Sequence, residues 1–302
     1  SAAMVLPICA YNYPVLIVSF CLLGIGNTLM QVSLNPLVNC IVTGDKLAST
    51  LTFGQFVKAI ASFIAPIIAS LAAAKFGNWL LLFPFFLVFS IVATVYLSLT
   101  EIKEPAVKVE SLSFFKCIKL LGDSSVLLFF LGIVCHVGID VGVNTCAPKI
   151  IMERFALPLE KAAFATSIYF LFRTIGCFAG SFILAKFPLK KFFAVSVACM
   201  VLSMAGLFLC HTLTGLYVAI ALVGFGNSNI FSMIFSSALL YKPENDNEMS
   251  GLMIMGLIGG TIFPLLMGVL SDAFASQTGS VVVITAGVAY LIFLAARFLK
   301  KA

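Results

Sequence analysis

Side chains that could bind a polar ligand recur at helical spacing inside apolar stretches of this chain. Asn27, Gln31 and Asn35 follow one another every four residues, so on a helix they share one face. Neutral amides offer hydrogen-bond donors and acceptors without a charge, which suits the hydroxyls of a sugar. Hydrogen bonding between helices is the alternative, worth only about 0.6–2 kcal/mol for each bond. We favour the ligand-binding face, because Pro36 and nearby glycines are typical of a helix shaped around a cavity.

A second group of side chains carries charge. Gln55 and Lys58 share one helical face, and a charge that far inside an apolar stretch costs about 2.5–3.5 kcal/mol unless it is hydrated or paired. His136, Asp140 and Asn144 again recur every four residues, and Asp140 is the only carboxylate deep within an apolar stretch. These spacings predict that Lys58 will have a carboxylate partner.

We therefore predict an ion pair between Lys58 and Asp140 that gates or couples a transport cycle, with His136 titrating beside it. A purely structural pair is the alternative. Arg173 is the remaining charge inside an apolar stretch, and we expect it to have a gating or structural role near one mouth of the pathway.

The chain contains an internal repeat. Gly24-Ile-Gly-Asn and Gly224-Phe-Gly-Asn begin two similar stretches at an offset of 200 residues, and residues 60–66 match residues 258–264 at an offset of 198. In the second copy, Asn227 and Asn229 form the polar surface that corresponds to the amides of the first. Duplicated helical halves with polar residues at mid-membrane depth indicate a secondary transporter.

Composition indicates an integral membrane protein. Of the 302 residues, 62% are hydrophobic and only 10% are charged, and the mean hydropathy is +1.15. The apolar runs are continuous, without the alternation of a membrane β-barrel, so we predict an all-α protein. Nine runs have the length of a membrane span, about 20 residues, near residues 14–41, 50–74, 78–99, 125–148, 160–185, 190–210, 214–240, 249–271 and 278–298.

The basic residues orient these spans. With residues 100–123 in the cytoplasm, twelve lysines and arginines lie on the cytoplasmic side against four outside, which also places the C-terminus inside. The net charge of +6 is then mostly this signal, with membrane lipid and not nucleic acid as the partner. The second part of the same loop is amphipathic, and we expect it to lie flat on the inner leaflet.

These features divide the chain into residues 1–99, a cytoplasmic linker over 100–123, and residues 124–302. The last part holds six predicted spans, but only three complete spans precede the linker. We expect residues 1–12 to be the end of a further helix, and three helices of a six-helix half to lie upstream. A genuine nine-helix protein is the alternative.

The sequence lacks the usual signals for catalysis. No His-Glu-x-x-His, Gly-x-Ser-x-Gly or Gly-x-Gly-Asp pattern occurs, so we predict neither an enzyme nor an intramembrane protease. The nine cysteines include no Cys-x-x-Cys pair and are interpreted as packing residues, without a metal site or cofactor. A multidrug exporter remains an alternative, although it would prefer an aromatic cavity to one rich in amides.

Residues 224–236 and 250–272 resemble the tenth and eleventh helices of the fucose permease family, which is part of the major facilitator superfamily. Residues 24–36 and 51–55 resemble its fourth and fifth helices. The resemblance implies two pseudo-symmetric six-helix halves, of which this chain would hold helices 4–12. It also implies alternating access and symport of a monosaccharide such as fucose, glucose or galactose by a monomer in the bacterial inner membrane. A drug or metabolite exporter and a non-transporting fragment stay open as alternatives.

Several positions depart from that family's pattern. Gln31 stands where the proton-coupled fucose permease has a glutamate, so this position cannot carry a proton here; the glucose and galactose branch also has glutamine. Phe231 replaces a tyrosine and Lys58 an asparagine, while His136 stands where relatives have Glu or Gln and Asp140 replaces a small residue. Coupling to a proton or to sodium is therefore predicted to involve Asp140, Lys58 and His136.

Overall fold

The computed structural model describes residues 1–42, 46–100 and 114–300, and the regular structure in these ranges is helical. Nine stretches of the described residues are long and apolar enough to cross a membrane, which confirms the predicted all-α membrane fold. Seven of these spans are single helices: α2 (Tyr13–Ile41), α3 (Lys46–Phe76), α4 (Leu82–Leu99), α6 (Ser124–Phe155), α8 (Phe164–Lys186), α9 (Leu189–Leu209) and α14 (Thr278–Lys300). The short helices α1 (Ala2–Cys9) and α7 (Leu159–Ala162) precede α2 and α8.

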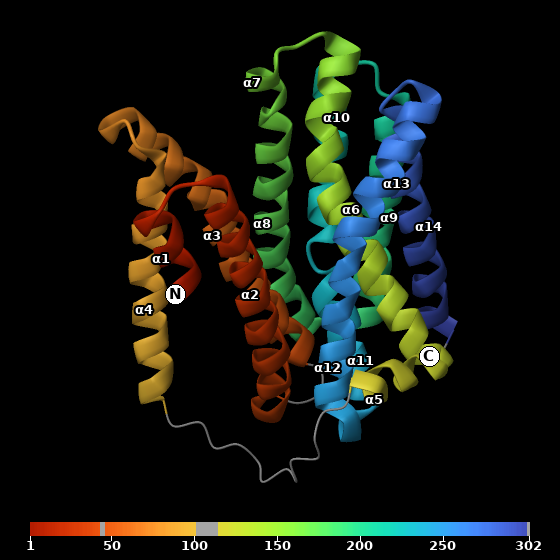
Figure 1. Cartoon of the computed structure of the whole chain (residues 1–302). Helices are drawn as coiled ribbons and strands as arrows, with labels where there is room; N and C mark the ends of the chain where they lie inside the picture. The colour runs from red at the N-terminus through yellow and green to blue at the C-terminus, as the bar shows by residue number, and fades with distance from the viewer. Residues whose placement is uncertain (43–45, 101–113, 301–302) are drawn as a thin grey trace.

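Helix α5 (Phe114–Lys119) is short and lies across the lower end of the bundle (Figure 1). It presents Phe115 and Ile118 to the surroundings, as expected for the predicted amphipathic segment. The first part of that segment and the charged linker before it fall on residues 101–113, outside the described residues.

Two predicted spans are broken in the structure. Residues 214–240, expected as one helix, form α10 (Leu213–Asn227) and α11 (Ile230–Tyr241), and residues 249–271 form α12 (Asp246–Met255) and α13 (Gly259–Phe274), joined by a 3-10 turn. At the first break the Ser228 hydroxyl donates to the Phe225 carbonyl at 2.6 Å, and the Asn229 amide donates to Ser228 Oγ at 2.7 Å. Such local side-chain bonds compete with the regular helix ladder. The matching stretch of α2 stays helical, so the repeat does not extend to the break.

Glycines of the repeat have different surroundings in its two copies. A Cβ on Gly224 would lie 2.6 Å from the Tyr169 carbonyl oxygen on α8, and one on Gly226 would lie 2.7 Å from the Ser196 carbonyl oxygen on α9. The corresponding Gly24 and Gly26 on α2 have no atom within 4 Å of that position among the described residues. Only the second copy therefore uses these glycines for close approach of helix backbones.

This difference predicts opposite results for one substitution at two equivalent positions. Gly224→Ala should lower the apparent melting temperature, because a methyl group against a backbone carbonyl forces α10 away from α8, and overpacking costs about 1–3 kcal/mol. Gly24→Ala is the matched control, and alanine's better helix propensity should leave that variant as stable as the parent or slightly more stable. Thermal unfolding in detergent measures both. Equal destabilisation by the two substitutions would contradict the packing described here.

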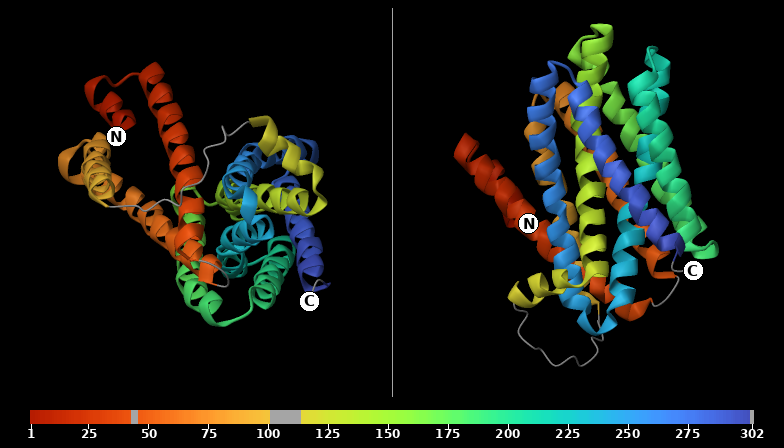
Figure 2. Two further views of the ribbon diagram at one scale, coloured as in Figure 1. Left: turned by 90° about the horizontal axis from the view of Figure 1, so that it is seen from below. Right: turned by 90° about the vertical axis from the view of Figure 1, so that its right-hand side faces the viewer.

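The two parts of the chain on either side of the linker meet mainly along α3 and α8. We call residues 1–99 the N-terminal half and residues 124–302 the C-terminal half. Helix α3 packs against α8 and α11, and α2 packs against α12. From below, the red-to-orange helices of the N-terminal half lie to one side of the green-to-blue helices of the C-terminal half (Figure 2). Most of the buried core lies in the C-terminal half.

Hydrogen bonds between the halves occur near one end of the bundle. Ser49 Oγ donates to the Ser181 carbonyl at 2.6 Å, and Asn39 Nδ2 donates to Asp246 Oδ2 at 2.6 Å. Ser250 Oγ donates to the Val32 carbonyl at 3.3 Å. The helices of the two halves converge at this lower end and diverge toward the upper end (Figure 1).

Candidate functional site

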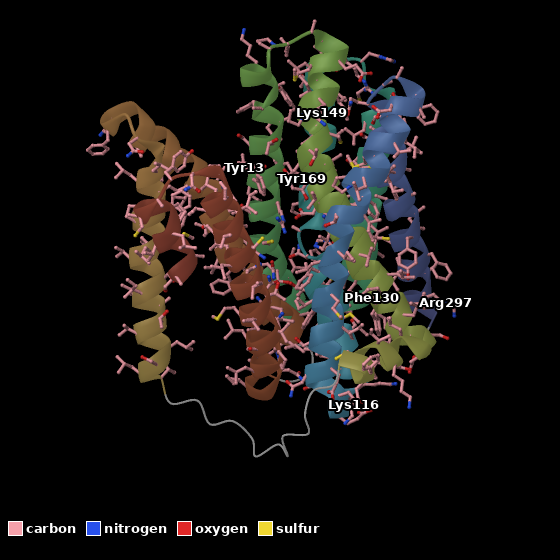
Figure 3. All side chains as sticks on the ribbon, in the orientation of Figure 1. Tyr13, Lys116, Phe130, Lys149, Tyr169 and Arg297 are labelled. Carbon is pink, nitrogen blue, oxygen red and sulfur yellow. The ribbon has the colours of Figure 1, made fainter. Side chains whose placement is uncertain are left out.

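Asp140 lies at the middle of α6 and has two partners on α8. Its Oδ2 atom is 3.1 Å from Nη1 of Arg173, and its Oδ1 atom accepts a hydrogen bond from the Tyr169 hydroxyl. Tyr169 and Arg173 are four residues apart in α8 and therefore share one face, which lets both reach the same carboxylate. Tyr169 is buried, and its label in Figure 3 lies where α8 faces α6.

The predicted ion pair between Lys58 and Asp140 was wrong in its choice of cation. In the described residues Asp140 pairs with Arg173, and no ion pair of Lys58 is formed. The reason is tertiary: α8 packs directly on α6, whereas α3 reaches this half through α8 and α11. Arg173 also lies near the middle of its helix and not at a mouth, where it had been expected.

His136 and Asn227 form a second contact, one helical turn along α6 from Asp140. His136 Nδ1 is 2.8 Å from Asn227 Oδ1, and Asn227 Nδ2 donates to the His136 carbonyl at 3.3 Å. Both side chains are buried, and the Phe231 ring lies 6.0 Å from the imidazole. Because an amide oxygen can only accept, the Nδ1 atom of His136 carries the proton in this contact.

We call Asp140, Tyr169, Arg173, His136 and Asn227 the polar cluster. It joins α6, α8 and α10 at mid-span and combines one carboxylate, one guanidinium, one phenol, one imidazole and one amide. Such groups can exchange a proton or repartner when helices move. Among the described residues no group of three His, Cys, Asp or Glu side chains comes together to hold a metal ion.

Sequence reasoning missed Tyr169. Its hydroxyl is a direct partner of the buried carboxylate, yet a tyrosine in an aromatic apolar helix is not distinctive by itself. The spacing Tyr169-x-x-x-Arg173 could have indicated this role. It places the tyrosine hydroxyl one helical turn from Arg173, the only cation near the middle of that helix.

Two other predicted residues of the C-terminal half bond to helix backbone, Asn144 within its own helix and Asn229 to a neighbouring helix. Asn144 Nδ2 donates to the Asp140 carbonyl of its own helix at 3.0 Å, and its Oδ1 atom is buried without a partner among the described residues. Asn229 Nδ2 donates to the Gly176 carbonyl at 3.0 Å, so this amide ties the break between α10 and α11 to α8. The structure thus gives Asn229 a clear packing role.

The predicted residues of the N-terminal half have fewer partners. Asn27 is exposed on α2, while Gln31 and Asn35 are half-buried, and the amide nitrogens of the latter two have no partner among the described residues. On α3, Gln55 is half-buried and Lys58 is exposed. Lys58 is nevertheless close enough to the polar cluster to interact electrostatically with Arg173 and Asp140.

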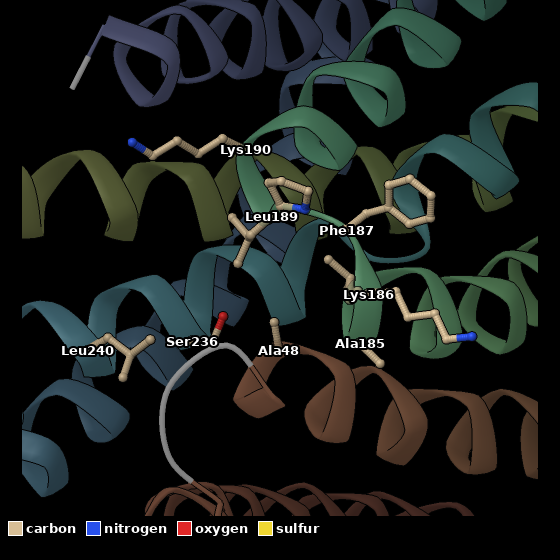
Figure 4. A pocket seen from close by; sticks show the side chains of 10 residues that line it. Ala48, Ala185, Lys186, Phe187, Leu189, Lys190, Ser236 and Leu240 are labelled. Atoms are coloured by element: carbon tan, nitrogen blue, oxygen red, sulfur yellow. The ribbon is translucent and has the colours of Figure 1, made fainter. Parts of the chain in front are cut away.

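A cavity of about 420 Å³ lies away from the polar cluster, where α3 begins and α8 ends. Ala48 lines it from the N-terminal half, and Leu184, Ser236 and Leu240 line it from the C-terminal half. The amino groups of Lys186 and Lys190 point away from its centre (Figure 4). None of the residues predicted to bind substrate lines this cavity, which lies between the halves near the end where they are hydrogen-bonded.

Comparison with known sequences gives a family and several relatives. A model of the Major Facilitator Superfamily matches residues 1–256. A protein named glucose/galactose transporter from Brucella abortus biovar 1 is 26% identical over 290 residues, which cover 90% of this chain and 69% of that protein. A putative glucose/galactose transporter from Helicobacter pylori (strain J99) is 26% identical over 267 residues, covering 83% of this chain and 65% of that protein.

Comparison with solved structures supports the same fold. A variant of the E. coli fucose:proton symporter superposes with a TM-score of 0.83 at 20% identity, over 98% of this chain and 80% of that one. The same transporter in the outward conformation gives 0.80 at 18% identity, over 98% and 78%. A bacterial homologue of the iron transporter ferroportin in an outward-facing state gives 0.65 at 14% identity, over 99% and 79%.

Proposed function

The chain belongs to the Major Facilitator Superfamily, and from that premise we propose that it is a secondary active transporter that imports a monosaccharide by alternating access, coupled to a cation. The observation that carries this proposal is the polar cluster at mid-span, in a helical bundle whose halves are hydrogen-bonded near one end. Placing polar and charged groups at this depth in a membrane is costly, so their presence there points to a transport pathway. The names of the two bacterial relatives support a sugar of the glucose and galactose class.

The position of the hydrogen bonds between the halves supports a conformation that is closed on the cytoplasmic side. Lys46 and Lys242 lie beside the end where the halves meet, and the excess of basic residues there favours the cytoplasm. The structure then represents a carrier closed to the cytoplasm and opening outward. We propose a multi-pass protein of the bacterial inner membrane with a cytoplasmic C-terminus. Residues 1–99 would belong to the first six-helix half and residues 124–302 would form the second.

We assign coupling to Asp140. Gln31 cannot titrate, and Asp140 is the only carboxylate at mid-span. Its contacts with Arg173 and Tyr169 can be made or broken as α6 and α8 move, which would link protonation or cation binding to access. The coupling ion is a proton or sodium. His136, one turn away and bonded to Asn227, lies within the same network.

Equilibrium binding of labelled monosaccharides to the purified protein tests this function. Asn227→Ala and Gln55→Ala should each weaken binding roughly tenfold or more, because each removes an amide near the proposed pathway and, at Asn227, leaves His136 without its partner. Asn247→Ala, at an exposed asparagine in the first turn of α12, is the matched control and should bind as the parent does. Unchanged affinity in both test variants would count against the proposed site.

A further inference from the structure

Three charged side chains lie near the middle of the spans, and two of them neutralise each other. The three are Lys58, Asp140 and Arg173, since the other charged residues of the spans lie nearer the helix ends. The guanidinium of Arg173 and the carboxylate of Asp140 are 3.1 Å apart and form a compensated pair. With His136 counted as neutral, these three side chains leave one positive charge at this depth among the described residues.

That charge belongs to Lys58. The described residues give its ammonium no ion pair, and the side chain is exposed. Lys58 lies twelve residues after the first residue of α3, which places it about 18 Å along that helix. This depth is close to the middle of a hydrocarbon core roughly 30 Å thick, beyond the reach of a lipid headgroup at either surface.

The surrounding charges do not compensate Lys58. Asp140, the one carboxylate near this depth in the described residues, is already paired with the Arg173 guanidinium at 3.1 Å. An uncompensated cation at mid-span is unfavourable, and a bound anion relieves that cost. The position therefore favours a ligand that brings its own negative charge.

The neighbouring side chains suit the rest of a sugar. Gln55 lies three residues before Lys58 on the same face of α3, and it is half-buried. On α2, Gln31 and Asn35 carry amide nitrogens without a partner among the described residues. Amides can both donate hydrogen bonds to hydroxyls and accept hydrogen bonds from them. An ammonium group only donates, and it prefers a carboxylate as its acceptor.

We propose that Lys58 binds a carboxylate of the substrate, and that the preferred substrate is a monosaccharide with one carboxylate, a hexuronate or an aldonate, in place of a neutral hexose. This inference rests on the proposed sugar transport and specifies its substrate class. One carboxylate balances the one ammonium. A sugar phosphate brings about −1.5 to −2 charges at neutral pH and would leave an excess of the opposite sign.

Competition binding with the purified full chain tests the substrate class. Glucose, glucuronate and glucose 6-phosphate are compared at fixed pH and salt against the parent, Lys58→Met and Lys58→Arg. The parent should bind glucuronate roughly tenfold or more tighter than glucose, since a charge-assisted hydrogen bond is stronger than a neutral one. Lys58→Met should bring the two affinities close to equality, and Lys58→Arg should keep a preference for glucuronate. Lys75→Gln, an exposed lysine near the other end of α3, is the matched control for charge and should leave the ratio unchanged.

The outcomes separate this inference from the function on which it rests. Binding of glucose without a preference for glucuronate, or a preference that survives Lys58→Met, overturns the acidic substrate and leaves sugar transport standing. A preference for the phosphate overturns the assignment of one carboxylate. If none of the three sugars binds, the acidic substrate is overturned, and the proposed sugar transport is then tested separately by counterflow with other monosaccharides.

Discussion

Asp140→Asn should abolish accumulation of sugar against its gradient while downhill exchange continues. The asparagine oxygen can still accept the hydrogen bond of the Tyr169 hydroxyl, but Arg173 loses its carboxylate partner, so thermal unfolding of the variant is measured alongside transport. The substitution removes the only mid-span carboxylate, and with it the group that can take up a proton or bind a cation during the cycle. Accumulation and exchange are measured separately in proteoliposomes, with and without an imposed cation gradient.

The matched control for this change is Asp272→Asn, which removes an exposed carboxylate at the end of α13 and should keep full accumulation. If Asp140→Asn still concentrates sugar, Asp140 is not the coupling residue, and coupling must take place at a sodium site or another titratable group. Tyr169→Phe gives an intermediate test. It keeps the carboxylate but removes one of its partners, and should shift the pH dependence of accumulation without abolishing it.

Arg173→Met should destabilise the protein more than the double change Asp140→Asn with Arg173→Met. The single change leaves a carboxylate at mid-span without its cation, and breaking a buried pair in this way costs about 3–5 kcal/mol. Because the Arg173 and Asp140 side chains keep 18% and 17% exposure, we expect the lower part of that range. The double variant has no stranded charge, so its folded yield and apparent melting temperature should recover toward the parent.

The same comparison with Lys58 provides the contrast. Lys58→Met removes a cation that forms no ion pair in the described structure and strands no carboxylate, so the melting temperature should not fall and should not depend on whether Asp140 is also neutralised. If Arg173→Met is as stable as the double variant, or if Lys58→Met shows the stronger coupling to Asp140, the pairing described here is wrong.

The sequence predicted which side chains share a helical face but not which helices are neighbours. The spacing of His136 and Asp140 predicts that both share one face of a helix, and in the structure they lie one turn apart on α6, but the ion pair predicted between Lys58 and Asp140 was wrong. Lys58 was predicted as the partner of Asp140, and Arg173 was expected near one mouth of the pathway. The choice depends on α8 packing against α6, a tertiary contact that no periodicity in either helix encodes.

The helix breaks show a similar limit. Both copies of the repeat begin with Gly-x-Gly-Asn in continuous apolar runs, and both were expected to be single helices. The second copy is interrupted because Ser228 and Asn229 bond to nearby backbone and side-chain groups, and because Asn229 also reaches the Gly176 carbonyl on α8. The first copy has Thr28 and Leu29 in those positions and stays helical. The difference in helix continuity therefore arises from two residues and a neighbouring helix. The shared Gly-x-Gly-Asn motif does not predict it.

The central claim is that this bundle carries a monosaccharide through the region around the polar cluster, and counterflow tests it most directly. Proteoliposomes containing the purified chain are loaded with unlabelled sugar and diluted into trace labelled sugar, neutral and acidic sugars being tried in turn. We expect transient, saturable uptake of label for at least one monosaccharide. Asn227→Ala should reduce this uptake, and Asp140→Asn should retain it, because exchange needs the binding site but not the coupling carboxylate. Sugar transport by this chain is contradicted if uptake of every sugar tried is no greater than in protein-free liposomes. The protein preparation must show cooperative thermal unfolding, so that a misfolded sample is not the cause.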